Sequence, residues 1–379
     1  MGRAMAAADT RDKRAIWSAA LCGAAIGAYA SSAFRPALRQ DSEAGVAGDG
    51  AHDPVDHRLG GITALDPGRG RVAEAPTQIP YRGWRDILIR TFNEFFADRV
   101  LSLSAGVTFY TLLAIFPALA AFISLYGLFL DPASIQSQLE AASWFLPAGA
   151  VEVMRDQIAR LLANGPSSLG LRSFFSLALA LWSANAGTKA VIEALNIAYE
   201  EEERRSFVRL TLTTLGFTLA AILFAVVALA AVVALPLVLK VLYLPSGTEW
   251  LISLLRWPAL AVVVAFVITV VYRFGPCRQR PQWRWVSMGS AVAAVLWLAT
   301  SVGFSWYVSR FASYEQTYGS LGAVVGFMVW IWLSVTVVLL GAELNAEIEH
   351  QTALDTTTGP PLPMGARGAE MADTLGATQ

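Results

Sequence analysis

Six long apolar runs separated by shorter polar stretches follow one another through most of the chain. They occupy residues 103–130, 169–192, 209–235, 254–273, 286–308 and 319–343. Crossing a hydrocarbon core of ~30 Å takes ~20 helical residues, so each run is long enough to span a membrane. A backbone that crosses lipid must satisfy its own hydrogen bonds, which favours helices. The pattern predicts an all-α, polytopic membrane protein with a bundle of six transmembrane helices.

Two further helical patterns flank the first run. The stretch "YRGWRDILIRTFNEFFADRV" places Trp84, Leu88, Phe92, Phe95 and Phe96 on one face. It predicts either an amphipathic helix on the inner membrane surface or a helix packed on the bundle, and both readings stay open. Residues 131–168 are polar enough to form a small external helical cap.

The remaining segments have different compositions. Residues 1–80 form an N-terminal extension, in which the weakly apolar segment 15–34 is a signal peptide, a weak span or a surface helix, followed by a disordered linker. The membrane domain is predicted at 81–350. Residues 351–379 read as a disordered cytoplasmic tail, since they are rich in Gly, Pro and Thr.

Composition supports the membrane class and excludes others. Hydrophobic residues make up 55% of the 379 positions and charged residues 15%, against roughly 25% charged in soluble domains. A net charge of −1 without a basic patch argues against a nucleic-acid partner. Two cysteines and three histidines offer neither a disulfide framework nor a metal centre. No metal or other cofactor is expected, and the natural partners are membrane lipids.

The positions of basic residues predict the orientation. On one side of the predicted bundle lie twelve: Arg82, Arg85, Arg90, Arg99, Lys189, Arg204, Arg205, Arg209, Arg273, Arg278, Arg280 and Arg284. On the other side lie six: Arg155, Arg160, Arg172, Lys240, Arg256 and Arg310. Both ends of the six-helix core are therefore predicted in the cytoplasm.

Polar and helix-breaking residues inside membrane spans are costly, which makes them candidates for function. Tyr110 and Pro117 lie in the first run, and Pro117 should kink its helix. Trp182 and Asn185 lie in the second. For Asn185 the competing reading is a hydrogen bond between packed helices.

A polar cluster is predicted near the inner interface. The second and sixth runs end there with Lys189, Glu193, Asn196, Glu343 and Asn345. Lys189 and Glu193 are four residues apart and can pair on their own helix. A carboxylate near a helix C-terminus opposes the helix dipole, so Glu343 is expected to have a cationic partner, with Lys189 the candidate. Glu349 and His350 are assigned to the solvated tail.

The sequence lacks the sets of residues that an enzymatic active site would need. Glu347 and His350 form Glu-x-x-His, but a di-iron bundle needs a second such motif and further glutamates. No span places a histidine beside a serine or cysteine, as a hydrolytic triad would require. We therefore expect no enzymatic activity.

The chain also hints at an internal repeat. "SAGVTFY" at 104–110 and "SVGFSWY" at 301–307 align without a gap. Transporters often place their site between such repeats. Later matches need gaps, so chance similarity between small-residue helices stays open as an alternative.

The chain resembles the YihY/BrkB family of bacterial inner-membrane proteins, once labelled ribonuclease BN. The resemblance rests on stretches such as "AGVTFYTLLAIFPALAAFISLYGL", "ALWSANAGTKAVIEALNIAYEEEERR" and "SWYVSRFASYEQTYGSLGAVVGFMVWIW" between residues 80 and 350. It implies six transmembrane helices, a plasma-membrane location and a role in handling an amphipathic envelope component. A transporter or permease is then the leading function, with Tyr314, Tyr318 and Gly319 in the loop before the last run as further candidate site residues. Gly319 and Gly322 are either a flexible entrance to that run or a plain turn with helix-packing contacts. A structural or partner-binding protein without flux is the alternative, and a ribonuclease a distant third.

Overall fold

The computed structural model describes residues 67–126, 171–241, 249–310 and 320–379, with a few residues between 139 and 159. All belong to one compact unit, Leu65–Gln379. The regular secondary structure in this part of the chain consists of helices, with one isolated bridge between Pro281 and Thr357. Its elements are η1 (Pro67–Arg69), η2 (Pro76–Gln78), α3 (Tyr81–Ala97), α4 (Val100–Tyr126), α7 (Leu171–Ala198), α8 (Phe207–Val241), α9 (Glu249–Phe274), α10 (Trp283–Arg310), α12 (Ser320–Glu349) and α13 (Glu370–Asp373).

Each of the six apolar runs coincides over its described residues with a long helix, which confirms the prediction of a helical membrane protein. Four segments in the described residues are long and apolar enough to cross a membrane: Val100–Ile123, Phe207–Ala228, Trp283–Val308 and Val324–Glu349. A shorter apolar segment, Pro258–Phe274, lies in α9. The number of crossings, six, therefore stays a prediction.

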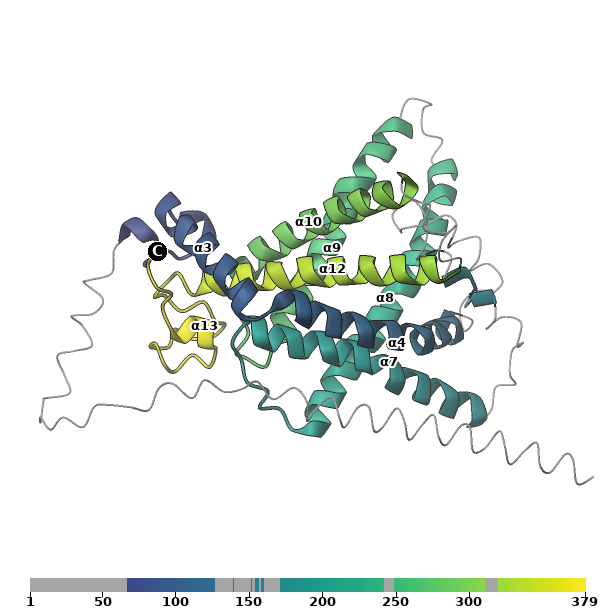
Figure 1. Cartoon of the computed structure of the whole chain (residues 1–379), viewed down its shortest axis with the longest axis horizontal. Coiled ribbons are helices and arrows are strands. Elements are labelled where there is room, and N and C mark those ends of the chain that lie inside the picture. The colour runs from purple at the N-terminus through teal and green to yellow at the C-terminus, as the bar shows by residue number, and fades with distance from the viewer. Residues whose placement is uncertain are drawn as a thin grey trace, which may run out of the picture. The chain divides into compact units, whose positions relative to one another are not determined.

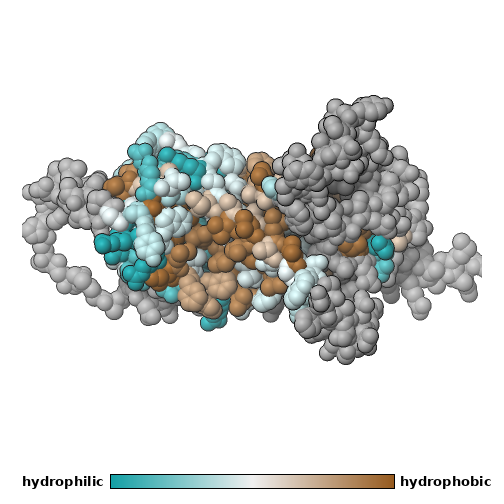
Figure 2. All heavy atoms as spheres, turned by 90° about the horizontal axis from the view of Figure 1, so that it is seen from above, coloured by the Kyte–Doolittle hydropathy of each residue, from teal (hydrophilic) through white to brown (hydrophobic). Residues whose placement is uncertain are grey.

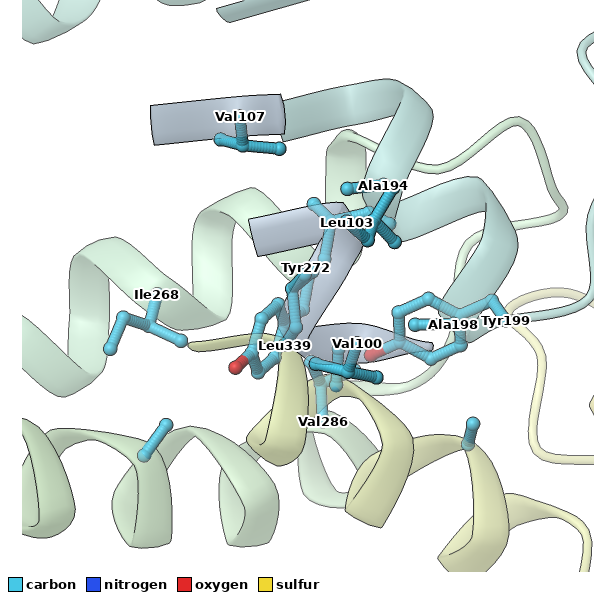
Figure 3. Close-up of a cluster of buried hydrophobic side chains, with 14 of the residues drawn as sticks. Val100, Leu103, Val107, Ala194, Ala198, Tyr199, Ile268, Tyr272, Val286 and Leu339 are labelled. Atoms are coloured by element: carbon cyan, nitrogen blue, oxygen red, sulfur yellow. The ribbon is translucent and has the colours of Figure 1, made fainter. Parts of the chain in front are cut away.

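Helix α12 packs against α3, α4, α7 and α10, and α4 pairs with α7 along its length (Figure 1). The largest buried cluster joins α4, α7, α9, α10 and α12 with Met371 of α13 (Figure 3). Val100 and Leu103 from α4, Ala194 from α7, Tyr272 from α9 and Leu339 from α12 meet there. On the visible face in Figure 2, hydrophobic residues form a broad band beside an end rich in hydrophilic ones.

Two glycines set the crossing of α10 and α12. A Cβ at Gly289 would lie 2.4 Å from the carbonyl oxygen of Gly341. A Cβ at Gly341 would lie 2.6 Å from the Cβ of Ala293. The backbones approach this closely only because neither residue has a side chain, as is common between membrane helices.

Helix α3 has the amphipathicity that the sequence predicts, but the side that contacts the bundle carries polar residues as well as the fully buried Ile87. Asp86, Arg90 and Thr91 are buried, whereas Leu88, Phe92 and Phe96 are exposed. The helix packs on α12, which fits the second of the two open readings. Its exposed apolar face is also compatible with the first reading, a helix lying on the membrane surface.

The tail prediction is wrong, since residues 351–379 fold against the helix ends. The guanidinium of Arg367 donates to the carbonyl oxygens of Ala353, Leu354, Leu362 and Ala372 and so holds the tail's turns together. Thr358 and Gln279 bond the tail to the loop between α9 and α10. Composition predicted disorder because it says nothing about hydrogen bonds between particular residues, and here one arginine donates to several carbonyl oxygens at once. The compact unit accordingly extends beyond the predicted limits of 81–350, to Leu65 and Gln379.

Several predictions lie outside the described residues. They concern segment 15–34, most of the linker, most of the external cap, and the loop residues Tyr314, Tyr318 and Gly319. Of the cap segment, Leu139, Val151 and Ile158 are described, and they are buried with Val226 of α8.

Candidate functional site

The chain's chemically distinctive residues gather at one end of the bundle, which we call the polar end. It is formed by the start of α4, the end of α7, the end of α9, the start of α10 and the end of α12. Helix α3 and the folded tail cover it (Figure 1). The segments that the charge rule assigned to one side of the membrane thus meet at one end.

Two buried ion pairs hold the polar end together. Arg90 of α3 pairs with Glu347 of α12 at 2.5 Å, and Arg278 of the α9–α10 loop pairs with Glu349 at 2.8 Å. Burial by itself would lower the pKa of Arg278, but Glu349 and the face of Tyr199, 4.0 Å away, raise it. Glu349 is 0% exposed, so its assignment to a solvated tail is wrong. His350 lies 3.7 Å from Glu347 and is only partly exposed.

Two predicted asparagines connect helices to their neighbours. Asn345 accepts from the backbone N–H of Gly289 and donates to the carbonyl of Val286, which fixes α12 on α10. Asn196 accepts from the backbone N–H of Cys277 and donates to Glu203. Both amides have their hydrogen-bonding groups occupied within the protein, so they position helices and loops.

Glu343 is the exception at this end, because its partners are acidic. The expected bond to Lys189 is absent: Lys189 lies 3.9 Å from Glu193 on its own helix. Glu343 is 2% exposed and shares a side-chain hydrogen bond with Asp98, with Glu94 close by. Its Oε1 has no hydrogen-bond partner within the described part of the chain. The predicted five-residue cluster therefore does not form as a unit, and we call Glu94, Asp98 and Glu343 the acidic cluster.

Asp98 occupies the joint between α3 and α4. It is the C-cap of α3, and the next residue, Arg99, has φ 52°, a left-handed conformation that non-glycine residues rarely adopt. Burial raises the pKa of Asp98 to about 6, and the nearby Glu94 and Glu200 add to this. The hydrogen bond from Glu343 acts in the opposite direction.

The other predicted residues lie elsewhere along the helices. Asn185 accepts a long hydrogen bond of 3.5 Å from Thr218 of α8, which favours the helix-packing reading. Trp182 is half exposed on α7, and Tyr110 contacts Phe109 on α4. Helix α4 continues through Pro117.

Sequence reasoning missed Asp98, Glu94, Arg90 and Arg278 as site residues. An acidic residue ahead of a helix is usually a favourable partner for the helix N-terminus, so Asp98 gave no signal. Only the packing of α3 and α12 brings these residues to Glu343 and its neighbours. Within the described residues no group of three or more His, Cys, Asp or Glu side chains has an arrangement that could hold a metal.

Comparison with known proteins places the chain in a family. Residues 91–363 match the family described as virulence factor BrkB. The chain is 32% identical over 271 residues to a ribonuclease-like protein, YfkH, of Bacillus subtilis, covering 69% of this chain and 95% of that one. UPF0761 membrane proteins of Chromobacterium violaceum and Alkalilimnicola ehrlichii are 25% and 30% identical, over 72% and 69% of this chain.

The chain spans 63% and 57% of the length of these two proteins. No solved structure matches. The family match covers most of the chain, including every described membrane helix and the start of the folded tail. The chain therefore belongs to the virulence factor BrkB family of membrane proteins.

Proposed function

We propose that this chain is a six-span transporter or permease of the bacterial inner membrane that moves an amphipathic envelope component and binds a proton at Asp98 and Glu343 as it does so. The observation that carries the proposal is the buried carboxyl of Glu343. Ionisable groups in membrane helices are costly, and they are characteristic of ion and proton pathways.

The proximity of the two buried carboxyls supports a proton held between them. Two carboxylates within hydrogen-bonding distance cannot both be ionised at low cost, so one proton is shared by the pair. Within the described residues, the charged groups that act on Glu343 are acidic: Asp98 and Glu94 from the α3–α4 segment and Glu347 from its own helix. Glu347 is already neutralised by Arg90. Protonation thus connects α12 to the α3–α4 joint, and loss of the proton makes them repel.

This repulsion would act at the joint between α3 and α4, where the backbone is strained. Arg99 is in a strained backbone conformation beside Asp98, and such residues often occur at switch regions. Separation of α4 from α12 on proton release would open the polar end, and reprotonation would close it. The basic residues gathered at this end support its placement on the cytoplasmic side.

The alternative function is a structural or partner-binding membrane protein without flux. The satisfied ion pairs Arg90–Glu347 and Arg278–Glu349 favour it, since they are what a static helix junction would also need. The ribonuclease-like name belongs to the Bacillus relative. RNA left intact by the purified protein would remove that third reading.

The test measures flux across vesicles containing the full-length protein. Fluorescently labelled phosphatidylglycerol serves as the amphipathic probe, and its movement between leaflets is followed by quenching from outside between pH 5 and 8. We expect the protein to accelerate this movement with a rate that depends on pH, because release of the shared proton would make the two carboxylates repel. Glu343→Gln and Asp98→Asn should lose the pH dependence.

Glu202→Gln is the matched control, because Glu202 is an exposed acid at the same end. It should retain the wild-type pH profile. An inactive wild-type protein, in vesicles where correct insertion has been verified, would contradict transport of this class of molecule. Flux that is unaffected by Glu343→Gln would remove the acidic cluster from the mechanism.

A further inference from the structure

Helix α3 presents an apolar face that nothing in the described protein covers. Leu88, Phe92 and Phe96 are 57%, 64% and 57% exposed. The Phe92 and Phe96 rings contact each other edge to face, with centroids 5.0 Å apart. The polar face, in contrast, is used against the bundle, where Arg90 and Asp86 are buried.

The same face becomes basic toward the start of the helix. Arg85 lies three residues before Leu88, and Arg82 three before Arg85, so both occupy the turns that precede the apolar stripe. Both arginines are exposed. Helix α3 therefore has a basic first half and an apolar second half along one side, and the apolar half is the part next to α4.

A pocket of about 300 Å³ lies at the basic half, lined by Arg69, Arg82, Arg85 and Asp86. The carboxylate of Asp86 is occupied, since it pairs with Arg69 at 2.6 Å and accepts from the backbone N–H of Gln379. Within the described residues Arg82 and Arg85 have no acidic partner. The pocket thus holds two uncompensated positive charges and can receive an anion.

We propose that α3 binds an anionic phospholipid, with the headgroup phosphate at Arg82 and Arg85 and the acyl chains along Leu88, Phe92 and Phe96. Guanidinium groups match phosphate oxygens with paired hydrogen bonds. Basic residues at a membrane surface attract anionic lipids, and an amphipathic helix buries its apolar side among the acyl chains.

Continuity with the membrane-facing surface identifies the occupant as a lipid. Helix α3 leads directly into α4, where Leu101 is 42% and Phe109 is 52% exposed. The apolar stripe of α3 is therefore followed along the chain by exposed apolar residues of a helix long and apolar enough to cross a membrane. An acyl chain beside this stripe would lie among the other lipids around α4, whereas a soluble partner would have to enter the bilayer.

The lipid would also fix the position of the helix that carries Arg90. Arg90 reaches Glu347 and Gln351 from the opposite side of α3. A lipid held on one side and α12 held on the other would keep α3 in place at the polar end. The site is distinct from the acidic cluster, and its occupancy requires no transport.

Native mass spectrometry of the detergent-solubilised full-length protein tests the proposal. The probe is phosphatidylglycerol, compared with phosphatidylcholine carrying the same acyl chains. Arg82→Gln/Arg85→Gln should raise the dissociation constant for phosphatidylglycerol about 30-fold, since each basic residue near an anionic membrane surface contributes about fivefold. Binding of phosphatidylcholine should change little.

Arg209→Gln/Arg284→Gln is the matched control, because it removes the same charge from exposed positions at the same end. It should leave phosphatidylglycerol binding within about twofold of wild type. Equal weakening by both double variants would reveal general electrostatic attraction and overturn the site.

A second pair of variants tests the apolar half. Phe92→Ala/Phe96→Ala should weaken phosphatidylglycerol binding without lowering the melting temperature, because both rings are exposed. Inorganic phosphate at millimolar concentration should not displace the lipid. Displacement by phosphate, or full binding by the Phe92→Ala/Phe96→Ala variant, would show a simple anion site and contradict a lipid site.

Discussion

At the scale of single residues, Glu343 and Arg278 show how neighbours decide the state of a buried charge. Arg278 is buried with Glu349 and the face of Tyr199, so its charge is matched. Glu343 is buried with Asp98 and Glu94, so its charge is not matched. The first arrangement holds a structure together, and the second is the basis of the proposed proton site.

The pH dependence of stability follows from Asp98. Its folded-state pKa, about 6, lies above the model-peptide value of 3.8, so the folded state binds more protons than the unfolded state. The contribution of this proton to stability is complete below about pH 4 and is lost as the pH rises through 6.

Asp98→Asn should therefore stabilise the protein at pH 7.5 by about 1 kcal/mol, a value reduced for solvent screening because the side chain is partly exposed. The gain should vanish near pH 4. Thermal melting in detergent across pH 4–8 measures it, with Glu202→Gln as the control for an exposed acid. A stabilisation that grows toward acid would be inconsistent with a raised pKa.

At the scale of elements, the α10–α12 crossing depends on small residues and one amide. Gly289 and Gly341 permit contact of the backbones, and Asn345 hydrogen-bonds the backbone of α10 at Gly289 and at Val286, one turn earlier. Because the amide of Asn345 is satisfied by the backbone of α10, it fixes the register of α12 on that helix in addition to the van der Waals packing of the glycines.

Gly289→Ala should lower stability by about 1–3 kcal/mol, since its Cβ would overlap the Gly341 carbonyl and the Asn345 side chain. Gly303→Ala is the matched control on the same helix, because a Cβ there meets nothing within 4 Å. That change should be neutral or slightly stabilising through helix propensity. The melting temperatures of the two purified variants test this prediction. An equal drop in melting temperature for both would refute the close crossing of α10 and α12.

At the scale of the whole molecule, the polar end gathers segments from the full length of the described unit. Residues 67–79, the loops after α7 and α9, and the tail all contact one another or the helix ends there. Arg71 reaches the carbonyls of Gln351 and Gly376, which connects the start of the unit to its end. An insertion or truncation at the C-terminus would thus disturb α3 as well.

The orientation has a direct test with cysteine labelling in a background lacking Cys22 and Cys277. A membrane-impermeant maleimide should label Ser137→Cys, in the predicted external cap, on intact spheroplasts. Arg284→Cys, at the polar end, should react only after the membrane is opened. Reversed labelling would place the polar end outside.

The sequence by itself was enough to predict the membrane class, the ranges of the six long helices, the amphipathicity of α3 and the family. These features depend on length, hydropathy and residue order within one segment, which neighbouring residues determine locally. The predicted run 319–343 differs from α12 by its last turns, because the polar residues after Glu343 stay helical through buried pairs.

Only the tertiary structure decided which charges meet. The predicted depths of Lys189 and Glu343 in the membrane were similar enough for the two side chains to meet. In the structure, the rotation and packing of the helices place Lys189 near Glu193 and bring Asp98 to Glu343 instead. The folded tail is a similar case, since Arg367 acts through carbonyls whose positions no composition encodes. Depth in a membrane is set by distance along one helix, whereas the partner of a buried charge is set by the relative rotation of two helices, which only their packing fixes.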